Sequence, residues 1–169
     1  MTDRFKTSGP IFDEIAEFFT GDEWGPEQLD GEPVLKMPFK GDHGEWTCLA
    51  YAHDERERFV FISILPIEVP EEKRGEASEY LTRANFGMEI GNFDMNYAEG
   101  IVQFRTSLDI EGGELSPKMI QNLAYINVMV TDQYLPGLVM VVEGDATPQE
   151  AVEKVENTES TETTENTEE

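Results

Sequence analysis

The spacing of apolar residues alternates between a helical and a strand-like period along the chain. The first apolar set falls at i, i+4, i+7 and i+8, the spacing of one helix face. Its members are Ile11, Ile15, Phe18 and Phe19. Pro10 suits the first turn of a helix, and Gly21 follows the last apolar position. The pattern predicts a helix from about residue 10 to residue 20.

Three strands are predicted next, over residues 34–39, 45–53 and 58–65. The polar tetrapeptides that separate them have the composition of hairpin turns. Three strands joined by such short connections favour an antiparallel meander. Pro38 lacks a backbone N–H, and we therefore expect the first of these strands to lie at an edge.

A second helix is predicted to open at residues 69–72, where two glutamates complement the positive end of the helix dipole. Its expected buried face consists of Ala77, Tyr80, Leu81 and Ala84. Gly87 is a natural stop. Two more strands are predicted over residues 89–96 and 101–110. The second alternates apolar and polar side chains, as in a sheet with one exposed face.

A third helix is predicted to begin at Pro117 behind the capping residue Ser116. Its apolar positions are spaced by 4, 3 and 4 residues: Met119, Leu123, Ile126 and Val130. Pro136 and the glycine after it should kink or break this helix. Residues 138–142 are β-branched enough to form a strand, but we favour a second helical segment.

Thr147 and Glu150 have the spacing of a capping box, which predicts a short helix over residues 148–156. Residues 157–169 contain only Glu, Thr, Asn and Ser, and so offer no apolar surface to offset the entropy of ordering. The expected organisation is therefore one α+β domain over residues 1–156 followed by a disordered acidic tail over residues 157–169. The element order α-β-β-β-α-β-β-α predicts a twisted antiparallel sheet with the helices packed on one face.

Charge excludes two classes of partner. The 169 residues carry 36 Asp and Glu against 12 Lys and Arg, a formal net charge of −24. This charge repels phosphate backbones and anionic lipids, and the basic residues form no cluster, so we expect neither nucleic acid nor membrane as a partner. The single Cys48 and the lack of an apolar leader at Met1 favour a cytoplasmic location.

No residue set indicates a reaction, a cofactor or a metal. His43 and His53 lie at opposite ends of a predicted strand, on the order of 30 Å apart at about 3.3 Å per residue, and cannot share a metal ion within one subunit. Cys48 shares its face of that strand with Trp46 and Ala50, which favours a buried thiol over a nucleophile. Carboxylate pairs are too frequent to be informative, and Gly-rich phosphate loops are missing.

Six residues are candidates for partner binding: Phe12, Trp24, Phe39, Trp46, Arg83 and Arg105. The aromatic residues could form an exposed binding surface, although core positions are the common alternative. The two arginines could bind a partner carboxylate through two parallel hydrogen bonds, with structural ion pairs as the alternative.

Residues 80–144 resemble the C-terminal part of YbjN-domain proteins. Five segments carry the resemblance: Leu-Thr-Arg-Ala-Asn-Phe-Gly (81–87), Ile-Gly-Asn-Phe (90–93), Phe-Arg-Thr-Ser-Leu-Asp (104–109), Gly-Gly-Glu-Leu (112–115) and Tyr-Leu-Pro-Gly (134–137). The resemblance implies a fold similar to type III secretion chaperones, with the same element order as the periodicity predicts. It implies no enzymatic activity, because YbjN-domain proteins are regarded as non-enzymatic. It also implies a role as a sensory-transduction or stress regulator.

These observations lead to one expected function and several alternatives. We expect a non-enzymatic binding module, chaperone-like or adaptor-like, that holds an apolar segment of a client protein and forms a homodimer, as members of the wider fold group commonly do. A regulatory module that binds a small effector is the first alternative, and it predicts a discrete pocket with convergent polar groups. An uncharacterised enzyme is the second. The third is that the acidity reflects a saline cytoplasm or mimicry of nucleic acid.

Overall fold

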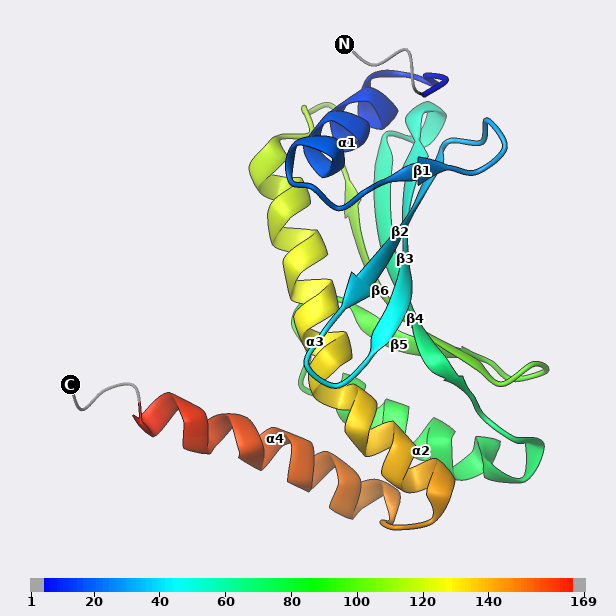
Figure 1. Ribbon diagram of the computed structural model, residues 1–169, viewed down its shortest axis with the longest axis vertical. Helices are drawn as coiled ribbons and strands as arrows, with labels where there is room; N and C mark the ends of the chain where they lie inside the picture. The colour runs from blue at the N-terminus through cyan, green and yellow to red at the C-terminus, as the bar shows by residue number, and fades with distance from the viewer. Residues whose placement is uncertain (1–4, 166–169) are drawn as a thin grey trace.

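The computed structural model describes residues 5–165, which form an antiparallel sheet and four α-helices (Figure 1). The elements in chain order are α1 (Pro10–Gly21), β1 (Glu27–Gln28), β2 (Val34–Lys40), β3 (Glu45–His53), β4 (Arg58–Glu68), α2 (Arg74–Asn85), β5 (Asn92–Asn96), β6 (Ile101–Asp109), α3 (Pro117–Glu143) and α4 (Pro148–Glu165). Short 3₁₀ turns precede β4 (Asp54–Arg56) and α2 (Glu71–Lys73). The six-stranded sheet has the order β1-β2-β3-β4-β6-β5, with every neighbouring pair antiparallel.

The helices gather on one side of the sheet, which confirms the predicted α+β architecture. Helix α3 packs across β4 and β6, α1 packs on β3, and α2 lies beside β5 (Figure 1). Alternate residues of the strands supply the buried core on this side, among them Phe59, Phe61 and Phe104, which are fully buried. The meander β2-β3-β4 and the pair β5-β6 are both present as expected.

Strand boundaries differ from the prediction where backbone geometry intervenes. Strand β5 begins at Asn92 rather than at residue 89, because Gly91 adopts φ +81°, which lies outside the extended region of a strand. Strand β4 runs on to Glu68 past a register shift after Ile64. The two-residue β1 was not predicted at all.

Helix α3 continues through Pro136, so the predicted break does not occur. Pro136 removes the N–H that would bond to the carbonyl of Asp132. The turn persists because its other residues are buried against α2 and α4, and because the hydroxyl of Tyr80 donates to the carbonyl of Tyr134 at 2.7 Å. Residues 138–142 are helical, as favoured, but as part of the same helix.

The buried face of α3 is rotated relative to the predicted one. Met119 is 36% exposed and Ile126 is only half-buried, whereas Asn127 and Thr131 are fully buried. Asn127 Nδ2 lies 3.1 Å from the carbonyl oxygens of Phe61 and of Phe104, so it ties the helix to β4 and β6. Hydrophobic periodicity misplaced this face because two of its central residues are polar.

Helix α4 begins with the predicted capping box. Both the backbone N–H and the hydroxyl of Thr147 donate to Glu150 Oε2, at 2.9 and 2.8 Å. The helix extends to Glu165, beyond the predicted end at residue 156, since adding residues to an established helix costs little. The expected tail therefore begins as a helix over residues 157–165, and residues 166–169 lie outside the described part of the chain. The proposed domain boundary at residue 156 stays a prediction.

Candidate protein-binding surface

The side of the sheet opposite the helices carries an apolar stripe on β3 and β4. Its members, which we call the outer sheet face, alternate with the core residues of the two strands and are half-buried: Thr47, Leu49, Tyr51, Val60, Ile62 and Ile64. Cross-strand register places Leu49 beside Ile62 and Tyr51 beside Val60. Within the described residues no helix covers this stripe (Figure 1).

Charged pairs surround the outer sheet face and balance one another. Arg105 contacts Asp94 at 3.0 Å, and Arg58 contacts Asp109 at 3.1 Å. The Lys40–Glu45 pair, at 3.1 Å, flanks the other side. The Glu111 backbone N–H, and then the Arg58 guanidinium, hold the pKa of Asp109 below its usual range. In a chain of charge −24 this face is close to neutral, and so it presents little electrostatic barrier to an apolar partner.

Strand β2 has a free edge beside this face. Gly41 N–H bonds to Gly44 O and Ala52 N–H bonds to Pro33 O, so the odd-numbered residues of β2 point their backbone groups toward β3. The even-numbered residues point outward, and β1 pairs only with Leu35 and Lys36. The carbonyl of Pro38 and both backbone groups of Lys40 therefore face away from the described strands. Pro38 lies on this unpaired half, as the edge prediction required, although β1 is the terminal strand.

Two shallow hollows connect the free edge with the outer sheet face. One, of about 450 Å³, is lined by Pro38, Phe39, Lys40, Glu45, Trp46 and Thr47. The other, of about 520 Å³, is lined by Leu29, Lys36, Glu45, Trp46, Thr47, Leu49, Ile64, Leu65 and Pro66. They share three residues and therefore adjoin. Both are open and predominantly apolar, a shape that suits a polypeptide segment better than a small polar effector.

The β2–β3 hairpin is held against α3 by Asp132. Its carboxylate accepts from the backbone N–H of His43 at 2.9 Å and lies 3.0 Å from His43 Nδ1. Gly41 permits this approach, because a Cβ there would lie 2.1 Å from Asp132 Oδ1. The contact fixes the position of the free edge relative to the body of the protein.

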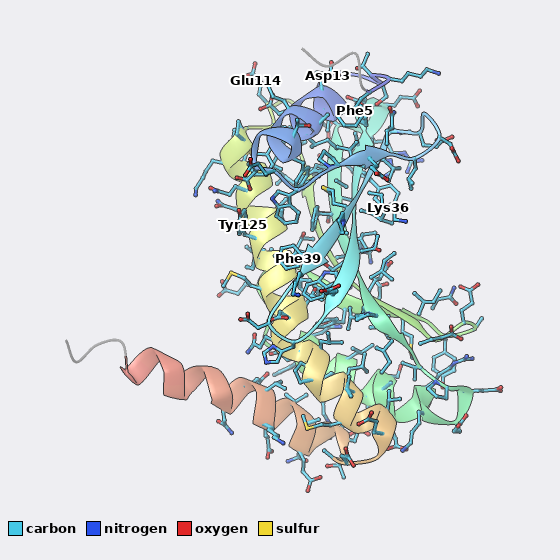
Figure 2. The ribbon with its side chains drawn as sticks, in the orientation of Figure 1. Phe5, Asp13, Lys36, Phe39, Glu114 and Tyr125 are labelled. Carbon is cyan, nitrogen blue, oxygen red and sulfur yellow. The ribbon has the colours of Figure 1, made fainter. Side chains whose placement is uncertain are left out.

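Three of the predicted aromatic residues pack against one another near the free edge of β2. Trp24 and Phe39 lie 5.3 Å apart between ring centroids, and Phe39 and Trp46 lie 5.1 Å apart. Figure 2 shows Phe39 on the side of β2 that faces α3. Trp24 Nε1–H and the Tyr125 hydroxyl both donate to Asp22 Oδ2. The bond between Tyr125 and Asp22 raises the pKa of Tyr125. Trp24 and Phe39 are half-buried, whereas Trp46 is 6% exposed and belongs to the core.

Cys48 lies in the core, as its strand position predicted. Its side chain is fully buried, and burial raises the pKa of the thiol to about 11 despite a 3.5 Å contact with the hydroxyl of Ser63. The indole N–H of Trp46 also donates to that hydroxyl, at 2.9 Å. A buried, protonated thiol is a poor nucleophile, and Cys48 has a packing role.

The other predicted candidates lie apart from this site. Phe12 is 1% exposed and packs against Phe5 in an edge-to-face contact, so it is a core residue. Arg105 borders the outer sheet face in its ion pair, and Arg83 pairs with Glu79 at 2.8 Å at the far end of α2. Partner binding by Trp24, Phe39 or the arginines stays a prediction.

Sequence reasoning missed two features of the site. The outer stripe was not separated from the core, although alternation in β3 and β4 marks two apolar faces. It also missed Asn85, whose amide closes the opposite edge of the sheet. Asn85 Oδ1 accepts from the N–H of Phe93 at 2.7 Å, and Asn85 Nδ2 donates to its carbonyl at 2.9 Å. These two bonds imitate a neighbouring strand, so β5 is less open to strand addition than β2.

The described residues contain no cluster of three or more His, Cys, Asp or Glu arranged to hold a metal ion. His43 bonds to Asp132, and His53 stacks on Tyr51 with ring centroids 6.2 Å apart. Among the described helices, none combines the length and hydrophobicity that crossing a bilayer requires.

Comparison with known proteins identifies the family. Residues 12–139 match the model of YbjN, whose description reads "Putative bacterial sensory transduction regulator". The chain belongs to the YbjN family. A search of curated proteins gives no significant match. The family match includes the β2–β3–β4 meander that carries the outer sheet face, and so extends beyond the C-terminal segments that carry the sequence resemblance.

Solved structures confirm the fold of this YbjN-family protein. It is similar to "YbjN, a putative transcription regulator from E. coli", with a TM-score of 0.55 and 12% identity over 78% of this chain and 87% of that one. The ExsC–ExsE complex gives a TM-score of 0.51 and 15% identity over 75% and 91% of the two chains. The HopA1–SchA chaperone–effector complex gives 0.45 and 16% over 76% and 94%. The similarities to YbjN and to ExsC, both with TM-scores above 0.5, confirm the expected type III secretion chaperone-like fold, and at these identities the similarity concerns the fold alone.

Proposed function

We propose that this protein binds an extended segment of a partner protein on the outer sheet face, acting as a non-enzymatic chaperone-like or adaptor-like module. The observation that carries the proposal is an apolar stripe that no described helix covers and that continues into the unpaired edge of β2. A partner strand at that edge would bond to the carbonyl of Pro38 and to both backbone groups of Lys40. The adjoining hollows would take its apolar side chains.

The charges of the molecule fit this role. The outer sheet face is nearly neutral, while the rest of the chain carries the acidic excess. An exposed apolar surface promotes self-aggregation, and a strong net charge opposes it through repulsion between copies. A protein that must hold an apolar segment and remain dispersed benefits from both properties.

The comparisons support a binding role without naming a partner. ExsC, which shares the fold, is seen in a complex with ExsE, and the family description is that of a regulator. A regulator that acts by holding another protein would agree with both the ExsC–ExsE complex and the family description. The homodimer and the cytoplasmic location stay predictions of this proposal.

Peptide selection followed by amide exchange tests the proposal. A phage-displayed library of 12-residue peptides is selected on the full-length chain, and the selected peptides are assayed on Leu49→Lys and on Met129→Lys. Met129 is exposed on α3, so its variant adds the same charge to an apolar position on another surface. We expect selected peptides to bind at least tenfold more weakly to Leu49→Lys and unchanged to Met129→Lys.

Amide hydrogen exchange then locates the bound strand. The amide of Lys40 points outward and should exchange rapidly in the free protein, then become protected in the complex. The amide of Phe39 points toward β3 and serves as the internal control, protected in both states. Selected peptides that bind both variants equally, or a Lys40 amide that the peptide leaves unprotected, would refute strand addition at this edge.

A further inference from the structure

Phe86, directly after α2, is the most exposed large apolar residue of the described chain. Its side chain is 95% exposed, whereas Tyr80, the aromatic residue within α2, is fully buried. A single exposed apolar side chain is ordinary on a protein surface. Phe86, however, stands at the rim of a groove, and Gly87 beside it contributes no side chain that would narrow the opening.

The groove lies between the end of α2 and the first half of α4 and has a volume of about 380 Å³. It is lined by Arg83, Phe86, Gly87, Gln149, Val152, Glu153 and Glu156. Val152 is buried and forms part of an apolar surface, while the polar residues stand at the margins. An aromatic ring beside a concave apolar surface is the arrangement in which a partner's side chain can be held from two sides.

The margins of the groove are acidic. The positive charge of Arg83 is engaged by Glu79 at 2.8 Å. The Glu153 carboxylate accepts only from the neutral amide of Gln149, and that of Glu156 accepts from the hydroxyl of Tyr134. Both glutamates therefore lack a cationic partner among the interactions seen in the described residues, and the electrostatic complement of this groove is a cation.

The first half of α4 adds a third carboxylate to the two that line the groove. Glutamates stand at positions 150, 153 and 156, and Lys154 is the only basic residue between them. Figure 1 shows α4 leaving the body of the molecule past α3. A cationic segment seated in the groove would therefore also meet the exposed carboxylate of Glu150.

We propose that the α2–α4 groove docks a lysine- or arginine-rich amphipathic segment of a partner protein. An apolar side chain of that segment packs between Phe86 and Val152, and its cationic side chains face Glu153 and Glu156. This surface shares no residue with the outer sheet face, so the two sites are independent and a protein could occupy each.

A synthetic peptide probe tests the groove. The probe is an 18-residue fluorescent peptide with leucine on one helical face and lysine on the other, and its control is a scrambled peptide of the same composition. Binding to the full chain is measured by fluorescence anisotropy. We expect the amphipathic peptide to bind at least tenfold more tightly than the scrambled one, because charge alone cannot distinguish the two.

Variants separate the groove from general attraction to an acidic protein. Phe86→Ala should weaken binding at least tenfold, whereas Tyr97→Ala, which removes an exposed aromatic ring from the β5–β6 turn, should change it less than twofold. Glu153→Gln should weaken binding more than Glu55→Gln, which removes an exposed charge near α1. Phe86 has almost no packing to lose, so Phe86→Ala should fold normally.

Two outcomes would overturn the proposal. In the first, Phe86→Ala and Tyr97→Ala bind the probe with the same affinity, or the amphipathic and the scrambled peptide bind the protein with the same affinity. In the second, sedimentation shows a wild-type dimer that Phe86→Ala converts to a monomer, because a second copy would then occupy the groove. Neither outcome tests the outer sheet face, because that face shares no residue with the groove. Leu49→Lys tests the outer sheet face separately and leaves the groove unchanged.

Discussion

Gly137 on α3 leaves space for the hydroxyl group of Tyr80 on α2, and a methyl group at position 137 would sit 2.2 Å from that oxygen. The hydroxyl donates to the carbonyl of Tyr134 at 2.7 Å. Burial raises the pKa of Tyr80 far above its ordinary value, so the group remains a donor at all physiological pH. The contact lies beside Pro136, where α3 lacks a backbone donor, and α2 thus supports the helix where it is weakest.

Gly137→Ala is expected to destabilise the protein. Alanine is favoured over glycine inside a helix by about 1 kcal/mol. Overpacking against Tyr80 typically costs about 1–3 kcal/mol, so the expected net loss of unfolding free energy is up to about 2 kcal/mol. Urea unfolding of Gly137→Ala and of Gly75→Ala measures the difference, because Gly75 in α2 has no atom within 4 Å of an added methyl group. Equal stabilisation of the two variants would show that Tyr80 can move aside.

Asn85→Ala is expected to open the edge of β5 that the Asn85 amide closes. The variant loses two hydrogen bonds to the backbone of Phe93, which should cost about 1–3 kcal/mol of unfolding free energy. It should also scatter more light at high concentration, because the bared strand can pair with another copy. Asn122→Ala, at an exposed position of α3, is the control. Unchanged stability and scattering would mean that water replaces the amide without cost.

Cys48 is expected to resist thiol reagents in the native protein. Its pKa of about 11 leaves on the order of one thiolate in 1,000 at pH 8, and the side chain is fully buried. Reaction with a chromogenic disulfide should therefore be at least 100-fold faster in denaturing urea than in buffer. Native reactivity comparable to that of the unfolded chain would indicate frequent opening of β3.

The capping box of α4 predicts a pH dependence of its stability. Bonds from the backbone N–H and then the hydroxyl of Thr147 lower the folded-state pKa of Glu150 below 4.5. The ionised carboxylate therefore stabilises the folded state above the ordinary glutamate pKa, and this contribution is lost as pH falls through the lowered value.

Glu150→Gln measures that contribution. Its loss of unfolding free energy should be present at pH 7 and vanish in acid, whereas Glu89→Gln, at an exposed loop position, should be neutral at both pH values. A carbon NMR titration of the wild type gives the folded-state pKa directly. A midpoint at or above 4.5 would contradict the capping geometry.

Local sequence patterns were sufficient to predict an element where one property, such as apolar spacing or a capping pair, defined it. The spacing of Ile11, Ile15 and Phe19 gave α1, and Thr147 with Glu150 gave the start of α4. They failed where distant residues decide. Asn127 is polar yet fully buried, because the carbonyls of β4 and β6 receive its amide. Pro136 should kink or break a helix, but no break occurs, because packing and the Tyr80 hydroxyl hold the turn together.

The binding surface shows the same division. Of the aromatic candidates, Trp24, Phe39 and Trp46 do come together, but Phe12 and Trp46 are core residues. Phe86 and Asn85 belong to the segment 81–87 that carries the family resemblance, but nothing in the sequence indicated their roles, because a lone aromatic residue and a lone amide occur in many loops. Their meaning follows from what stands next to them: the α4 helix in one case and the backbone of Phe93 in the other.

By itself the sequence determined the order of the elements apart from the two-residue β1, the antiparallel meander, the acidity and the YbjN resemblance, since each depends on composition or on neighbours along the chain. Only the tertiary structure decided which sheet face stays uncovered. Strands β3 and β4 are apolar on both faces, with Leu49 alternating with Cys48 and Ala50, so their period cannot tell the covered face from the open one. That choice depends on where α1 and α3 pack, which is a long-range consequence of the whole fold.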